Sequence, residues 1–123
     1  MRIERERQAG GPIVRGFVGS GFRVDETVYR ALFLTPEAAV EWTPPPIDML
    51  AIDALGGALA IDPEFVLIGT GQALVRPPAK LIAALDAKGI GVEAMDSRAA
   101  ARAWGVLRGE GRIIAALLYP LDA

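Results

Sequence analysis

Three apolar runs in the second half of the chain constrain the fold more than any other feature of the sequence. They are Phe65 to Ile68, Ile90 to Met95 and Ile113 to Leu118. Their apolar residues are largely consecutive, a pattern typical of strands covered on both faces, as in a parallel sheet with helices packed on it. Segments of helical period separate the runs. The stretch from Phe65 to Leu118 is therefore predicted to fold as strand, helix, strand, helix, strand.

The two helices of this unit have recognisable ends. Pro77-Pro78 opens the first helix, and Gly89 is placed to end it. Asp96 or Ser97 can cap the second by accepting a hydrogen bond from a first-turn amide. The predicted buried positions are Leu81, Ile82 and Leu85 in the first helix, and Ala100, Ala103, Trp104 and Leu107 in the second. A strand-helix-strand crossover returns the chain parallel and right-handed, so the strand ends at Gly69 and Asp96 should share one edge of the sheet.

The N-terminal half is richer in strand signals. Residues 13–18 and 22–24 are predicted to form a hairpin around the turn Gly19-Ser20-Gly21. Residues 28–34 are predicted as one further strand and residues 39–42 as a short one. Apolar residues recur at helical spacing over residues 47–60, although Gly56-Gly57 costs about 1 kcal/mol per glycine in a helix. The fold class is α/β, with a β-α-β-α-β C-terminal unit preceded by a hairpin and extra strands.

The composition excludes several classes of function. At 123 residues the chain is expected to form one domain over residues 1–123. It contains no cysteine and no histidine, which excludes disulfides, thiolate metal sites and the Ser-His-Asp triad. Any acid-base chemistry would have to come from Asp, Glu, Lys or Tyr with a strongly shifted pKa. We predict no metal, no cofactor and no catalytic residue. The net charge of -2 offers no overall basic field for a nucleic-acid backbone.

Neither the N-terminal residues nor the apolar runs resemble a targeting signal or a membrane-spanning segment. Residues 1–11 are expected to be mobile, because their charges and the pair Gly10-Gly11 offer nothing to bury. The first seven residues alternate in charge, unlike a secretory signal. Gly, Pro, Asp or Arg interrupts every apolar run before it could span a bilayer. The expected location is the cytoplasm, while the oligomeric state stays open.

Candidate binding residues gather where the parallel strands end. Ligands of open α/β sheets collect outside the carboxyl ends of the strands. This rule selects Gly69-Thr70-Gly71 and Asp96-Ser97, with Arg76 as a nearby cation. Because no helix opens inside the glycine motif, we favour glycines that allow a sharp turn over a phosphate cradle.

The charged residues of the second helix and the second strand can each be interpreted in two ways. Arg98 and Arg102 share a helix face and could receive an anionic ligand or an acidic partner surface, or simply be solvated. Glu93 interrupts an apolar strand, so it is either exposed or held by an arginine. Arg102 and Arg112 are the candidates, and we predict a structural ion pair between Glu93 and Arg112.

Several segments in fixed order resemble one known family. They are residues 67–71, 76–78, 89–100, 106–107 and 110–112, which include Leu67-Ile68-Gly69-Thr70-Gly71 and Gly91-Val92-Glu93-Ala94-Met95-Asp96-Ser97-Arg98. The chain resembles the Mth938-like domain of unknown function, a family that includes the mitochondrial assembly factor three of respiratory complex I. The likeness covers the C-terminal half at motif level and only the order of elements before it.

The resemblance implies a three-layer α/β fold around a central mixed sheet and a role in assembly or protein interaction. It brings no established reaction. Where the family commonly has Cys-Arg-Thr-Tyr-Asn, this chain has Ala101-Arg102-Ala103-Trp104-Gly105, which counts against catalysis there. Two hypotheses remain. The first is a non-enzymatic factor that binds protein partners, and the alternative is a small anionic-ligand binder or enzyme that uses the crevice at the strand ends.

Overall fold

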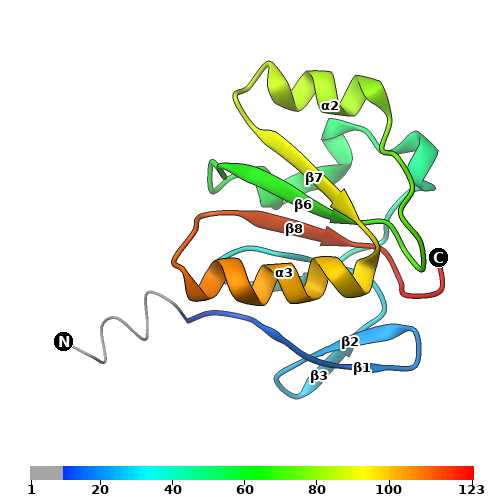
Figure 1. Cartoon of the computed structure of the whole chain (residues 1–123), viewed down its shortest axis with the longest axis vertical. Coiled ribbons are helices and arrows are strands. Elements are labelled where there is room, and N and C mark those ends of the chain that lie inside the picture. Colours follow the sequence, from blue (N-terminus) through cyan, green and yellow to red (C-terminus); the bar gives the residue numbers. More distant parts are fainter. Residues whose placement is uncertain (1–9) are drawn as a thin grey trace.

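A five-stranded mixed sheet forms the centre of the molecule, and a smaller sheet and helices cover it (Figure 1). The structure is a computed structural model and describes residues 10–123. Its elements are β1 (Val14–Val18), β2 (Gly21–Val24), β3 (Thr27–Tyr29), β4 (Leu32–Leu34), β5 (Ala39–Glu41), the 3-10 helices η1 (Ile47–Met49) and η2 (Ile52–Leu59), β6 (Phe65–Gly69), α2 (Ala79–Asp86), β7 (Gly91–Met95), α3 (Ser97–Gly109) and β8 (Ala115–Leu118).

The predicted β-α-β-α-β unit is confirmed. The strand order in the large sheet is β5-β4-β8-β6-β7, and β6 runs parallel to both β7 and β8. The antiparallel pairs β4-β8 and β4-β5 make the sheet mixed. The hairpin β1-β2 is also confirmed, and it continues into β3 as a separate three-stranded sheet.

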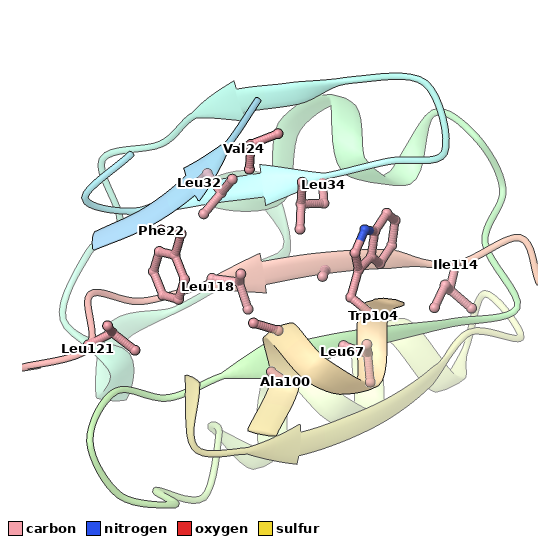
Figure 2. Close-up of a cluster of buried hydrophobic side chains, with 12 residues drawn as sticks. Phe22, Val24, Leu32, Leu34, Leu67, Ala100, Trp104, Ile114, Leu118 and Leu121 are labelled. Atoms are coloured by element: carbon pink, nitrogen blue, oxygen red, sulfur yellow. The ribbon is translucent and has the colours of Figure 1, made fainter. Parts of the chain in front are cut away.

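Consecutive residues of the apolar runs serve two cores, one on each face of the large sheet. Leu67 packs with α3 and the small sheet, whereas its neighbours Val66 and Ile68 pack with α2 and η2. Figure 2 shows the first of these cores, in which Trp104 of α3 and Phe22 of β2 point toward β8. The indole N–H of Trp104 donates to the Pro12 carbonyl at 2.8 Å, so α3 also holds the chain just before β1.

The predicted strand over residues 28–34 is wrong as one element. The chain bends at Arg30 and Ala31, so β3 pairs with β2 in the small sheet and β4 pairs with β8 in the large one. Strand-forming residues run through the bend without a break, because local propensity does not report which sheet a residue joins. Leu32 and Leu34 are fully buried, and their burial supports the second pairing.

The predicted helix over residues 47–60 is present as two 3-10 helices. Gly56 has φ 51° and ψ -134°, a conformation outside the helical region that interrupts η2. Positive φ is strained for any residue with a Cβ, so this break needs its glycine. The predicted mobility of residues 1–11 lies mainly outside the described residues. Within the described part, the Gly10 carbonyl accepts a hydrogen bond from Arg108 at 3.3 Å.

Candidate functional site

The carboxyl ends of β6 and β7 meet at one edge of the sheet, as the crossover rule predicts. The Thr70 amide donates to the Met95 carbonyl at 2.9 Å. The Ser97 amide donates to the Gly71 carbonyl at 2.8 Å, and the Gly71 amide donates back to Ser97 Oγ at 2.9 Å. The two turns that follow these strands are thus joined directly.

Ser97 has a structural role. Its side chain is fully buried, and its Oγ donates to the Tyr119 carbonyl at 2.8 Å while accepting from Gly71. A Cβ added at Gly69 would lie 2.9 Å from Ser97 Cα, closer than such atoms approach. The glycine therefore lets β6 and the start of α3 pack together. One backbone donor and one backbone acceptor thus engage the Ser97 hydroxyl, and its full burial keeps a surface ligand from reaching it.

Thr70 also has a structural role. It is 3% exposed, and its Oγ1 donates to the Ala73 carbonyl at 2.7 Å and accepts from the Val75 amide at 3.0 Å. These bonds fix the loop that connects β6 to α2. Leu74 and Val75, on this loop, are 63% and 42% exposed. A buried threonine therefore holds two apolar side chains in water at the carboxyl edge.

A hollow of about 480 Å³ lies beside this edge. Its lining includes three of the predicted residues, Gly71, Asp96 and Arg98, together with Gly19, Ser20, Gln72, Leu121 and Asp122. The last five were missed. Gly19, Ser20, Leu121 and Asp122 belong to the turn after β1 and the segment after β8, which reach the site only through tertiary contact, whereas Gln72 directly follows Gly71. The Leu121 amide, for example, donates to the Ser20 carbonyl at 2.9 Å. Thr70, Ser97, Arg76 and Arg102 are not part of this lining.

The electrostatics of the hollow are mixed. Asp96 caps α3 by accepting from the Ala99 amide at 2.9 Å, which places a carboxylate where an anion would otherwise meet the helix. Asp122 adds a second carboxylate, and its Oδ1 lies 3.7 Å from Nη1 of Arg30. The Arg98 guanidinium lies 4.7 Å from the centre of the Phe17 ring. An anion would meet two acids here beside one arginine.

The other predicted cations lie apart from the hollow. Arg76 is exposed on the loop after Val75, and Arg102 is exposed one turn beyond Arg98 on α3. Arg102 lines a second, smaller hollow against β1. The structure thus brings Gly69, Gly71, Asp96 and Ser97 together with Thr70, and leaves Arg76 and Arg102 on the surface around them.

The predicted ion pair of Glu93 with Arg112 is wrong in its partner. Arg112 pairs with Glu64, at 2.8 Å between Nη2 and Oε1, and Glu93 is exposed on β7. Arg112 precedes β8, whereas Glu64 precedes β6, and these neighbouring parallel strands bring their starts together. The Arg112 hydrogen bond lowers the pKa of Glu64, and the same bond raises the pKa of Arg112.

Tyr119 lies next to the carboxyl edge in an apolar environment. Its amide donates to the Gly69 carbonyl at 2.9 Å, and its hydroxyl donates to the Pro45 carbonyl at 2.7 Å. Burial, followed by the charge of Asp48, raises the pKa of Tyr119 to about 12. The phenol stays protonated in the neutral range and acts as a structural donor.

The described residues contain neither a cluster of metal ligands nor a helix that could span a membrane. Within residues 10–123, no three His, Cys, Asp or Glu side chains gather in a way that could hold a metal ion. Over the same residues, no helix has the length and apolar character needed to cross a bilayer. A cytoplasmic location stays a prediction.

Comparisons with known proteins point to one family. Residues 14–119 match the family described as "Protein of unknown function (DUF498/DUF598)". An uncharacterized protein of Rhodobacter capsulatus is 34% identical over 114 residues, which cover 92% of this chain and 88% of that one. The NADH dehydrogenase (ubiquinone) 1 alpha subcomplex assembly factor 3 of Danio rerio is 26% identical, over 100% of this chain and 72% of that protein.

A solved structure supports the same assignment. The solution structure of a Bordetella pertussis protein, named as a Mth938-like domain, has a TM-score of 0.77 and 26% identity, and the match covers 90% of this chain and 87% of that one. The resemblance predicted from the motifs is confirmed.

Proposed function

Since the chain belongs to the DUF498/DUF598 family of proteins of unknown function, we propose that it is a non-enzymatic interaction factor of the assembly-factor type. Its partner surface combines the carboxyl edge of the sheet with the Arg98 and Arg102 face of α3. Similarity to a protein named as a complex I assembly factor supports this role.

The observation that carries the proposal is the exposed pair Leu74 and Val75 on a loop fixed by Thr70. Exposed apolar side chains are common singly, but two adjacent ones on an ordered loop suit a protein contact. The loop is already ordered, so binding loses little conformational freedom. The cations Arg76 and Lys80 follow the pair in the sequence, and residues 70–85 contain no acid.

A recovery experiment tests this function. The tagged chain and the variant Leu74→Ser/Val75→Ser are purified from the cells that produce the protein, and the recovered proteins are compared by mass spectrometry. Ile113→Ser is the matched control, because Ile113 is 44% exposed and lies at the opposite, amino edge of the sheet. We expect at least one protein recovered by the wild type and by Ile113→Ser to be lost with the double variant. Identical recovery by all three would contradict the proposal.

The alternative, a small anionic ligand in the hollow, is favoured by Arg98 alone. Asp96 and Asp122 oppose it, and the hydroxyls of Thr70 and Ser97 are already bonded. A thermal-shift screen of anionic metabolites separates the two functions. A ligand at 100 times its Kd adds about 2.7 kcal/mol of apparent stability. A stability shift of this size that Arg98→Ala abolishes would support the ligand-binding function and contradict our proposal.

A further inference from the structure

A second hollow, of about 100 Å³, lies between β1 and α3. Its lining is Val14, Arg15, Gly16 and Phe17 from the strand, and Ala101 and Arg102 from the helix. The helix and the strand are in contact, and Figure 1 shows them as neighbours. We call this hollow and its rim the β1-α3 groove. None of its six lining residues is acidic.

A β-bulge shapes the strand side of the groove. Val14 pairs with Val24 and Gly16 pairs with Arg23, so Arg15 is left without a ladder partner between them. A bulge of this kind bends a strand and re-aims a side chain. Around this bulge, four consecutive residues of β1 contribute to the lining of the groove. β1 is also an edge strand of the small sheet.

Three arginines surround the groove. Arg15 and Arg102 line it, and Arg98 lies one helical turn before Arg102, over the ring of Phe17. All three are exposed, and none forms an ion pair with a carboxylate of residues 10–123. The whole chain has a net charge of -2, so this basic strip is a local feature. It attracts carboxylates although the chain as a whole is slightly acidic.

The size of the groove limits its occupant. Pockets for drug-sized ligands measure roughly 300–1,000 Å³, so 100 Å³ leaves room for one aliphatic side chain. Gly16 and Ala101 are the smallest residues of its lining. We propose that the β1-α3 groove binds an extended acidic segment of a partner protein, with one aliphatic side chain in the hollow and flanking carboxylates on Arg15, Arg98 and Arg102. This inference rests on the proposed function and names the chemistry of the partner.

A synthetic peptide tests the groove without knowledge of the partner. The probe is a fluorescently labelled peptide of alternating Glu and Leu, and its Kd is measured by anisotropy against a peptide with Lys in place of Glu. We expect the Glu peptide to bind, the Lys peptide not to bind, and the Kd to rise with salt, because the charges are exposed. Arg15→Glu and Arg102→Glu should each raise the Kd roughly fivefold or more.

Lys88→Glu is the matched control, since it makes the same charge change on the exposed turn after α2, which packs on the other face of the sheet. Its Kd should stay near that of the wild type. Circular dichroism of each variant checks the fold. The inference is overturned if the Glu peptide does not bind, if the groove variants bind it like the control, or if a labelled DNA oligonucleotide binds more tightly with the same dependence on Arg15 and Arg102.

The outcome is distinguishable from failure of the proposed function. If the peptide does not bind but the wild type recovers partners that Leu74→Ser/Val75→Ser loses, the interaction role stands and the groove has no part in it. If the peptide binds through Arg15 and Arg102 while no variant changes protein recovery, the groove is real and the interaction role at the carboxyl edge is wrong.

Discussion

The two edges of the central sheet use polar side chains in opposite ways. At the carboxyl edge, the buried Ser97 hydroxyl bonds to backbone groups of two other segments, and the buried Thr70 hydroxyl bonds to the loop that follows it. At the amino edge, Glu64 and Arg112 bond to each other in water. The carboxyl edge is where ligands collect in related architectures, yet here its hydroxyls maintain the fold. A polar side chain at an edge where ligands often bind can thus make hydrogen bonds that only stabilise the fold.

The largest expected difference between the edges comes from Gly69→Ala. The new Cβ would meet the backbone of Ser97 and the side chain of Leu118 at 2.9 Å, so the carboxyl edge must open. We expect a loss of about 3 kcal/mol in the free energy of unfolding, measured by urea titration. Gly109→Ala is the control, because a Cβ there meets nothing within 4 Å. Equal stability of the two variants would show that the edge is loosely packed.

Ser97→Ala should have the next largest effect. It leaves the Gly71 amide without its acceptor in a buried place, which costs about 2 kcal/mol. Ser20→Ala makes the same chemical change at an exposed hydroxyl that accepts from Arg30, so its effect should be much smaller. Both are measured by thermal unfolding. A Ser97→Ala protein as stable as Ser20→Ala would contradict the role assigned to this hydroxyl.

Alkaline pH should weaken the carboxyl edge through Tyr119. The pKa of Tyr119 is raised to about 12 in the folded protein and is near 10 in the unfolded chain, so the folded state holds its proton more tightly. The resulting stabilisation is complete below pH 10 and is lost as the pH rises from 10 through 12, by on the order of 2 kcal/mol. Tyr119→Phe should remove this part of the pH dependence. An unchanged slope between pH 10 and 12 in the variant would refute it.

The amino edge should give the smallest effect. The lowered pKa of Glu64 means that its pairing with Arg112 stabilises the fold above the unfolded-state pKa and stops doing so as the pH falls through the folded one. The pair is exposed, so solvent and salt screen it. Glu64→Gln should lower the thermal midpoint only slightly at neutral pH, and the difference should vanish in acid and in high salt. A large drop in the thermal midpoint that persists in high salt would contradict the conclusion that the amino edge contributes less to stability than the carboxyl edge.

The central sheet was predictable from the sequence because burial on both faces leaves a local pattern. Val66, Leu67 and Ile68 are consecutive, and each is buried against one of two cores. The parallel order of β6 and β7 followed from the crossover helix, and with it the meeting of the turns after Gly69 and Met95.

The features that were not predictable depend on tertiary contact. The bend at Arg30 changes sheets within a continuous strand pattern, and the partner of Arg112 depends on the relative register of β6 and β8. The share of the hollow contributed by Ser20 and Asp122 depends on how the hairpin docks. β4 pairs with β8, Arg112 pairs with Glu64, and Ser20 lies beside Leu121, and in each of these matches the two partners lie far apart in sequence, so no periodicity records them.

Amide hydrogen exchange at Gly71 and Val75 tests most directly whether the carboxyl edge serves the fold. These amides belong to a surface loop, yet they donate to the buried oxygens of Ser97 and Thr70 at 2.9 and 3.0 Å. We predict that both exchange slowly, at rates near those of the β6 strand, while the amide of Leu74 between them exchanges fast. Fast exchange at Gly71 and Val75 would show that the two hydroxyls are free, and it would return Thr70 and Ser97 to the set of residues available to a ligand.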